Sequence, residues 1–250
     1  MDRLMGYHSV EAALESERRT VERVWMERGN RSGRASRLRQ LARRHGVPVQ
    51  DLDRADLERM TGGAPRSAHQ GVLASVSPVP YADPEDLVES CGEEAILLVV
   101  DGVEDPRNLG ALVRTAAGAG VAAVFIPERR AAGISPTVAR AAAGATERVP
   151  VGRVGNLASF IDLLKDKGFW TIGLESTAPG FWDQTRYPAR MALVVGGEEK
   201  GLRRLVKERC DELVSIPLQE GVESLNVSVA TGICLYEALR QRREKGRGRG

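Results

Sequence analysis

The sequence lacks any apolar run long enough to cross a membrane. A membrane-spanning helix needs about 20 consecutive apolar residues, and no stretch of the 250-residue chain approaches that length. The first residues, MDRLMGYHSVEAALES, also lack the apolar core of a secretory signal. We therefore expect a cytoplasmic protein that makes no membrane contact.

Cysteine, histidine and lysine are all scarce. The three cysteines, Cys91, Cys210 and Cys234, lie far apart with no CxxC spacing, and the chain has only three histidines. This pattern predicts neither a disulfide framework nor a zinc site, and we expect no bound metal.

Positive charge is concentrated near the amino terminus. Up to Ser77 the chain has 14 arginines and 10 acidic residues, whereas the net charge of the whole chain is only +2. The planar fork of arginine suits phosphate and base edges, which favours RNA binding. A genome that favours arginine codons would give the same skew without any nucleic acid, because the chain has only five lysines, so both interpretations stay open. The basic tail at 244–250 could touch phosphate or be a solvated terminus.

The first 77 residues have the pattern of a small α/β module. We expect helices at 10–14 and 34–45, a third helix capped by Asp53, and strands at 21–26, 47–52 and 71–76. Three prolines between Pro78 and Glu85 then indicate a linker, which we extend to residue 90.

From residue 91 to 243 short apolar runs alternate with amphipathic stretches, as in a mostly parallel sheet covered by helices. We expect strands at 95–100, 121–126, 171–175, 191–197 and 212–217. We expect helices at 109–119, 136–145, 157–167, 202–209 and 225–243. Ligand sites in such sheets lie beyond the carboxyl ends of the strands, which directs attention to the loops after Val100, Val195 and Ile216.

Three segments near these loops carry unusual polar residues, each of which could also have an ordinary structural role. Asn108 in DPRNLG could be a helix N-cap, and Arg114 could extend into solvent or meet an anion. Gly196 and Gly197 would let backbone approach a flat ligand, while Glu198 could be an acid at a helix start. In SLNVSVA, Ser224 is a natural N-cap, and Asn226 could satisfy exposed amides.

Taken together, DPRNLG with RTA (114–116), GGEEKGL (196–202), and IPL (216–218) with SLNVSVA (224–230) resemble the three ordered motifs of the SpoU/TrmH RNA 2'-O-ribose methyltransferases. GYHSVEAA at 6–13 and HQGV at 69–72 resemble the family's L30e-like RNA-binding domain, so the resemblance covers the whole chain. CDELVSIP (210–217) and VATGICLYEA (229–238) suggest the branch that methylates a guanosine in large-subunit ribosomal RNA. The second motif usually reads Glu-Gly where this chain has Glu198 and Glu199.

The resemblance implies an α/β fold with a deep trefoil knot, a homodimer, S-adenosylmethionine as cofactor and RNA as substrate. By position in the motifs it assigns catalytic roles to a set of polar residues: Asn108, Arg114, Glu198, Ser224 and Asn226. Backbone and apolar side chains around Gly196, Ile216, Leu218 and Leu225 would hold the cofactor. An arginine is a poor general base, so Arg114 is expected to anchor phosphate and polarise the 2'-hydroxyl.

Three other functions compete with this one. A Rossmann methyltransferase or dehydrogenase would need a GxGxxG turn after its first strand, and VVDGVEDP at 99–106 lacks it. A non-catalytic ribosome-assembly factor would fit the basic module but would not need Arg114, Glu198 and Asn226 in these contexts. A transfer-RNA 2'-O-methyltransferase stays open, because the catalytic motifs alone do not choose the RNA.

Overall fold

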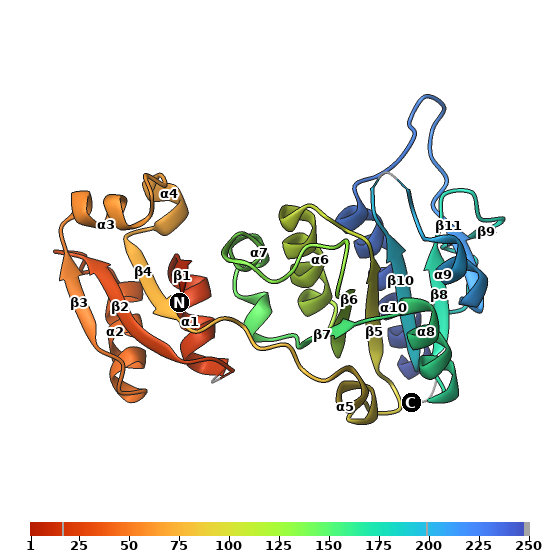
Figure 1. Ribbon diagram of the computed structural model, residues 1–250, viewed down its shortest axis with the longest axis horizontal. Helices are drawn as coiled ribbons and strands as arrows, with labels where there is room; N and C mark the ends of the chain where they lie inside the picture. The colour runs from red at the N-terminus through yellow and green to blue at the C-terminus, as the bar shows by residue number, and fades with distance from the viewer. Residues whose placement is uncertain (17, 199, 248–250) are drawn as a thin grey trace. The chain divides into compact units, whose positions relative to one another are not determined.

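The computed structural model describes residues 1–16, 18–198 and 200–247, and the chain divides into two compact units. The first unit contains Met1–Pro80 together with Ile134–Arg148, and the second contains the rest of the chain. The first unit therefore takes in a segment that the sequence pattern assigned to the carboxyl-terminal half. Figure 1 shows the helices and strands of both units.

The first unit is built on a four-stranded sheet in the order β1-β4-β2-β3, with β2 and β3 parallel and the other pairs antiparallel. Its core includes Leu4, Val24, Leu38 and Ala139, all buried. Its elements are β1 (Asp2–Met5), α1 (Tyr7–Ser16), β2 (Val21–Glu27), α2 (Gly33–Arg44), β3 (Val49–Leu52), α3 (Arg54–Met60), α4 (Arg66–His69), β4 (Val72–Val76), α7 (Pro136–Ala142) and the 3-10 helix η1 (Ala145–Glu147).

A buried ion pair attaches the 134–148 segment to the amino-terminal residues. Arg19 and Glu147 pair through Nη2 and Oε1 with their side chains almost fully buried, and Thr146 Oγ1 donates to the same Glu147 oxygen at 3.1 Å. Arg18 Nη1 also donates to the Thr146 carbonyl oxygen at 3.4 Å. Because an unpaired buried charge is costly, this contact makes the segment an integral part of the first unit.

The second unit has a seven-stranded sheet in the order β7-β6-β5-β10-β8-β11-β9, and every pair is parallel. The predicted α/β fold with a mostly parallel sheet is thus confirmed. Its elements are α5 (Pro84–Glu89), β5 (Ile96–Asp101), α6 (Pro106–Gly118), β6 (Ala123–Pro127), β7 (Val151–Val154), α8 (Leu157–Asp166), β8 (Trp170–Leu174), β9 (Gly180–Phe181), β10 (Met191–Gly196), α9 (Arg204–Arg209), β11 (Glu212–Ser215) and α10 (Val227–Arg247).

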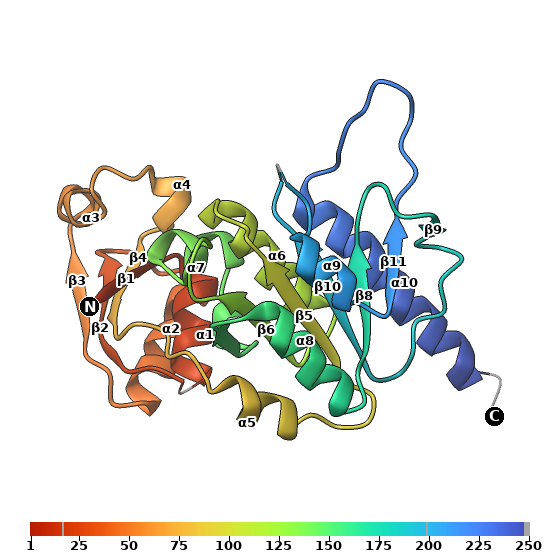
Figure 2. The same cartoon turned by 45° about the vertical axis from the view of Figure 1, so that its right-hand side comes forward.

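Helices cover both faces of this sheet, as its continuous apolar strands require. Leu97, Val99 and Val194 pack with residues of α5, α8 and α9 in one buried cluster. Figure 2 shows α8 and α9 on one face and α10 on the opposite face, where α10 packs against α6. The segment between β11 and α10 projects beyond the end of the sheet.

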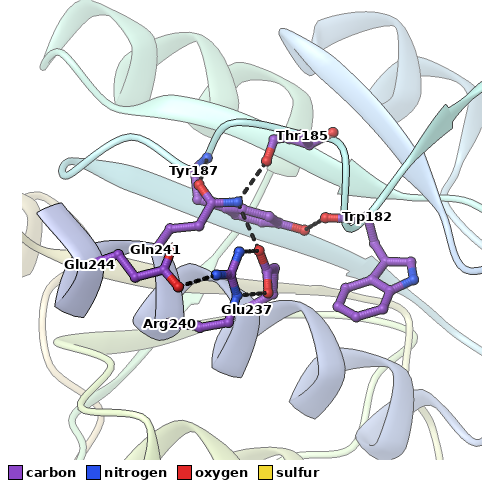
Figure 3. Close-up of polar contacts among 7 residues, drawn as sticks. All are labelled: Trp182, Thr185, Tyr187, Glu237, Arg240, Gln241 and Glu244. Atoms are coloured by element: carbon purple, nitrogen blue, oxygen red, sulfur yellow. Dashed lines mark hydrogen bonds and ion pairs between the residues drawn. The ribbon is translucent and has the colours of Figure 1, made fainter.

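The carboxyl-terminal half of α10 is fixed by a polar network (Figure 3). Gln241 Nε2 donates to the Thr185 carbonyl oxygen and to Glu237 Oε1, both at 2.9 Å, and its Oε1 accepts from the Tyr187 amide at 3.1 Å. The buried Tyr187 hydroxyl donates to the Trp182 carbonyl oxygen at 2.9 Å. This network, which we call the 182–187 clasp, holds the connection between β9 and β10 against the last helix.

The structure differs from the local sequence predictions in several places. The stretch predicted as a linker contains the helix α5, which starts at Pro84 with Asp83 as N-cap. The strands β1, β7 and β9 were not predicted. The basic tail predicted from residue 244 is helical as far as Arg247, and its last residues lie outside the described part of the chain.

Candidate active site

The turn after β10 is a tight crossing of backbone that only glycine permits. A Cβ atom at Gly196 would lie 2.1 Å from the carbonyl carbon of Gly201, and one at Gly197 would lie 2.6 Å from the Gly102 carbonyl oxygen. Gly201 itself has a φ of +59°. The sequence pattern predicted that these glycines bring backbone close to a ligand; in the structure they let backbone segments approach each other.

A cavity of about 380 Å³ opens beside this turn, at the carboxyl ends of β8, β10 and β11. Its volume lies in the range of about 300–1,000 Å³ that is usual for small-molecule sites. The four residues predicted to hold the cofactor all line it, as do two of the predicted catalytic residues. These are Gly196, Ile216, Leu218 and Leu225, with Glu198 and Ser224.

The lining fits S-adenosylmethionine chemically. Glycine backbone and the apolar side chains of Ile216, Leu218 and Leu225 offer a surface on which a purine can pack. A buried carboxylate, Glu175, also lines the cavity and can accept hydrogen bonds from hydroxyl or amino groups. Among the described residues, no group of three or more His, Cys, Asp or Glu side chains is placed to hold a metal ion.

A larger hollow of about 690 Å³ lies at the amino ends of the strands and is lined by none of the motif residues. It is bordered by Trp170, Glu212 and several charged side chains. In open parallel sheets, ligands bind beyond the carboxyl ends of the strands, so the smaller cavity is the better candidate despite its size.

Three side chains from the three motifs form one hydrogen-bonded chain. Asn108 Nδ2 donates to Glu198 Oε1, and Asn226 Nδ2 donates to Asn108 Oδ1 at 2.9 Å. Asn226 Oδ1 in turn accepts from the backbone amide and the hydroxyl of Ser228, at 2.9 and 2.6 Å. We call these residues the 108–198–226 relay. It connects α6, the turn after β10 and the start of α10, which lie up to 118 positions apart in the sequence.

Arg114 does not take part in this relay. Its side chain is exposed on α6, and among the described residues no hydrogen bond or ion pair involves it. Six residues of helix place it about 9 Å farther along the axis than Asn108. The structure therefore brings together Asn108, Glu198 and Asn226 with Ser224 nearby in the cavity wall, and leaves Arg114 facing solvent.

Asn108 and Glu198 do not have the ordinary structural roles that their sequence contexts allowed. Asn108 is not an N-cap, because α6 starts at Pro106 and Asp105 caps it by accepting from the Arg107 amide at 2.8 Å. Glu198 does not stand at a helix start, since α9 begins at Arg204. The residue beside it, Glu199, where the motif differs from the usual pattern, lies outside the described residues.

Ser224 is not an N-cap either. Helix α10 begins at Val227, and the side chain that accepts an amide hydrogen bond in its first turn belongs to Asn226. The expectation that Asn226 satisfies exposed amides is therefore met, while its amide nitrogen also joins the relay. One side chain thus has both a structural role and a place in the site.

Comparison with known proteins relates this architecture to one family. Residues 95–236 match the SpoU rRNA Methylase family, and residues 3–82 match the family described as RNA 2'-O ribose methyltransferase substrate binding.

Individual relatives agree with both matches. The chain is 42% identical to the 23S rRNA (guanosine-2'-O-)-methyltransferase RlmB of Escherichia coli K12, over 96% of this chain and 98% of that protein. It is 39% identical to RlmB of Pseudomonas putida, over 98% of each chain. The fold also matches the crystal structure of the SpoU methyltransferase AviRb from Streptomyces viridochromogenes in complex with AdoMet, with a TM-score of 0.80 at 24% identity, covering 97% of this chain and 90% of that one. On the strength of its motifs, its fold and these matches, the chain belongs to the SpoU rRNA methylase family.

Proposed function

We propose that this protein transfers a methyl group from S-adenosylmethionine to the ribose 2'-hydroxyl of a guanosine in large-subunit ribosomal RNA. The observation that carries the proposal is that the second and third motifs line one cavity, while Asn108 of the first motif donates a hydrogen bond to Glu198 in the cavity wall. The 108–198–226 relay thus joins all three motifs. The guanosine and the ribosomal RNA are inferred from the names of relatives that match almost the full length of the chain.

S-adenosylmethionine supplies an electrophilic methyl group and needs neither a metal nor a covalent enzyme intermediate. The protein then has to align the ribose 2'-oxygen with the methyl carbon of the cofactor. Holding two reactants in a reactive geometry by itself gives a large rate enhancement. Asn108 and Asn226 fix the carboxylate of Glu198 through the relay, and Ser224 stands beside it in the cavity wall. We assign to these residues the orientation of the target ribose.

Arg114 is assigned to the RNA and not to the cofactor. Its guanidinium has no partner among the described residues, so it is available to a phosphate of the substrate. Because arginine keeps its proton at any physiological pH, it anchors phosphate and polarises the 2'-hydroxyl instead of removing the proton. The 2'-hydroxyl proton would pass to solvent water as the methyl group transfers, with S-adenosylhomocysteine as the other product.

The first unit is assigned to RNA binding, with α2 as its main basic surface. Of the five arginines on this helix, three are paired with acids: Arg34 with Glu11, Arg37 with Glu15, and Arg39 with Asp51. Arg43 and Arg44 are exposed and have no partner within the described residues. An arginine without an acidic partner can pair with an RNA phosphate, so these two should contribute most to the affinity for RNA.

We further infer a homodimer that uses the outer face of α10. Val229 and Tyr236 are about half exposed, and with Ile233 they form an apolar stripe at helical spacing. A second copy of the chain would cover this stripe.

The trefoil knot is also proposed, since β10 lies between β5 and β8 while the backbone crosses itself closely at Gly196 and Gly201. Within the described residues no helix is long and apolar enough to span a membrane. A cytoplasmic location follows if ribosomal RNA is the substrate.

Mapping of 2'-O-methyl groups across ribosomal and transfer RNA, in cells with and without the gene, tests the proposed reaction. We expect one guanosine of large-subunit ribosomal RNA to lose its 2'-O-methyl group when the gene is absent. A change confined to transfer RNA would replace the proposed substrate, and unchanged maps would refute the activity.

A further inference from the structure

Two buried carboxylates stand on either side of β10 at the carboxyl end of the sheet. Asp101 ends β5 and is 1% exposed, and Glu175 follows β8 and is 8% exposed. β5 and β8 are the two neighbours of β10, so the acids flank the strand that leads into the turn at Gly196. Neither carboxylate belongs to the three motifs.

Each carboxylate is paired with a cation of the α9 segment, Arg203 at its N-cap and Lys207 within the helix. Arg203 donates to Asp101 twice, from its backbone amide at 2.9 Å and from Nε at 2.5 Å. Lys207, four residues later, places its Nζ 2.7 Å from Glu175 Oε2. Because residues four apart lie on one face of a helix, α9 is held against the sheet by two ion pairs side by side.

Only one of the two paired carboxylates lines the cofactor cavity. Asp101 has both carboxylate oxygens engaged by Arg203 and does not line the cofactor cavity. Glu175 lines the cavity, and its Oε1 has only one recorded polar neighbour among the described residues, the Thr177 hydroxyl at 3.4 Å. Since an ionised carboxylate offers about four acceptor positions, Glu175 keeps acceptor capacity that the protein does not use.

The free acceptor positions of Glu175 indicate which part of the cofactor it binds. A carboxylate accepts hydrogen bonds and cannot donate them, so its partner must be a hydroxyl or an amine. Lys207 already offsets the negative charge of Glu175, which argues against Glu175 as the counter-ion of the sulfonium or the amino group. In doubly wound sheets, an acid near a strand end typically accepts from ribose hydroxyls of a bound nucleotide.

We propose that Glu175 binds the ribose hydroxyls of the cofactor and that Lys207 is the positioning residue that holds its carboxylate in place. The proposal rests on the proposed function, because it takes S-adenosylmethionine as the ligand of this cavity. It predicts that recognition by Glu175 depends on the cofactor hydroxyls and not on the methyl group. S-adenosylmethionine and S-adenosylhomocysteine should therefore depend on Glu175 equally.

Calorimetric titration of the full chain tests this with three ligands: S-adenosylmethionine, S-adenosylhomocysteine, and 2',3'-dideoxy-S-adenosylhomocysteine. Glu175→Met should weaken the first two by the same factor of about ten or more, as expected for losing a hydrogen bond to a charged acceptor. It should leave the affinity for the dideoxy ligand nearly unchanged. Glu175→Gln, which keeps a neutral acceptor of the same shape, should lose less.

Arg203→Met is the matched control, because it breaks the equivalent ion pair on the other side of β10. It should weaken the hydroxyl-bearing and dideoxy ligands alike, because both pairs hold α9 against the sheet. Lys207→Met should weaken the hydroxyl-bearing ligands more than the dideoxy ligand. If Glu175→Met alone fails to fold, the double variant Glu175→Met with Lys207→Met can be used, because it also removes the Lys207 ammonium that would otherwise lack a partner. The double variant should bind the two hydroxyl-bearing ligands more weakly and the dideoxy ligand about as well as the unaltered protein.

Equal loss for all three ligands in Glu175→Met would overturn the proposal, and so would unchanged affinity for S-adenosylhomocysteine. A loss confined to S-adenosylmethionine would instead make Glu175 a partner of the sulfonium, which also contradicts it. If the unaltered protein binds none of the three ligands, it is the proposed function that fails.

Discussion

At the scale of single residues, Arg114 stands apart from the relay that joins Asn108, Glu198 and Asn226. Arg114→Ala should reduce methyl transfer by about 100-fold or more, because a charged contact made to the substrate during the reaction is lost. Cofactor affinity should stay the same, since Arg114 does not line the cavity. Single-turnover methylation and calorimetry separate the two effects. Arg114→Lys keeps the charge and should retain part of the activity; full activity in Arg114→Ala would remove the residue from the mechanism.

Asp211 gives a pH-dependent prediction. Partial burial would by itself raise the pKa of Asp211, but hydrogen bonds from Lys165 and from the amide and hydroxyl of Thr171 outweigh it and hold that pKa below its usual value. A carboxyl whose pKa is lower in the folded state stabilises the fold above its unfolded pKa, and this contribution is lost as the pH falls through the folded pKa. Asp211→Asn should therefore reduce the free energy of unfolding at pH 7 by about 1–3 kcal/mol.

Urea denaturation over a series of pH values from neutral to acid checks this. The difference between Asp211→Asn and the unaltered protein should shrink as the pH falls. Asp183→Asn, at an exposed carboxyl with no recorded partner among the described residues, is the control and should change little. A difference that is constant with pH would show that the charge of Asp211 does not contribute.

At the scale of elements, the 182–187 clasp ties α10 to the connection between β9 and β10. Gln241 makes three hydrogen bonds in it, one of them to the amide of the buried Tyr187. Gln241→Ala should lower the free energy of unfolding by about 1–3 kcal/mol, because partly buried backbone groups lose their partner. Denaturant titration measures this, with the exposed Gln219→Ala as control. Equal stability of the two variants would contradict a structural role for the clasp.

The sequence predicted the long buried strands and the helices between them, because continuous apolar runs such as 95–100 are typical of parallel strands covered on both faces. It did not predict β7, a four-residue strand whose apolar pattern is interrupted by Arg153, or the two-residue β9. The prolines around Pro84 were interpreted as a linker, although proline is also favoured at the first position of a helix, which is where Pro84 stands in α5. Short strands and proline-initiated helices depend on tertiary neighbours that local patterns do not reveal.

For the site, the motifs predicted the gathering of four polar residues, Asn108, Glu198, Ser224 and Asn226, but neither their hydrogen bonds nor the exposed position of Arg114. The helix starts differ from the expected ones by two or three residues, and that shift moves Asn108 and Ser224 out of capping roles. Glu175 belongs to no motif, and only its place after a buried strand could have drawn attention to it. Its pairing with Lys207 joins residues 32 positions apart, which spacing alone does not predict.

At the scale of the whole molecule, the first unit cannot be removed by cutting the chain at residue 77. Residues 134–148 belong to that unit, and Glu147 would lose its buried partner Arg19. Removing one partner of a buried ion pair typically lowers the free energy of unfolding by about 3–5 kcal/mol. Weaker RNA binding by a truncated chain could therefore come from lost stability as well as from the lost RNA-binding surface. Surface charge reversal is the cleaner test.

Arg43→Glu with Arg44→Glu should weaken RNA binding and lower its dependence on salt. Each phosphate contact that is lost should reduce the slope of log affinity against log salt by about 0.7 to 0.9. Filter binding or fluorescence anisotropy at several salt concentrations measures both quantities. Arg54→Glu with Arg59→Glu changes the net charge equally, but these arginines are already paired with Glu58 and Asp56, so the effect should be smaller. Equal losses in both variants would favour a general charge effect over a surface centred on α2.

Three distant segments must act as one site for methyl transfer to a ribose hydroxyl. The most direct test incubates the purified protein with unmodified large-subunit ribosomal RNA and S-adenosylmethionine labelled in its methyl group, and then identifies the labelled nucleoside by mass spectrometry. We predict label in 2'-O-methylguanosine. The label should be lost in Asn108→Asp, because this change places a second carboxylate against Glu198. Label on a base, or undiminished label in that variant, would contradict it.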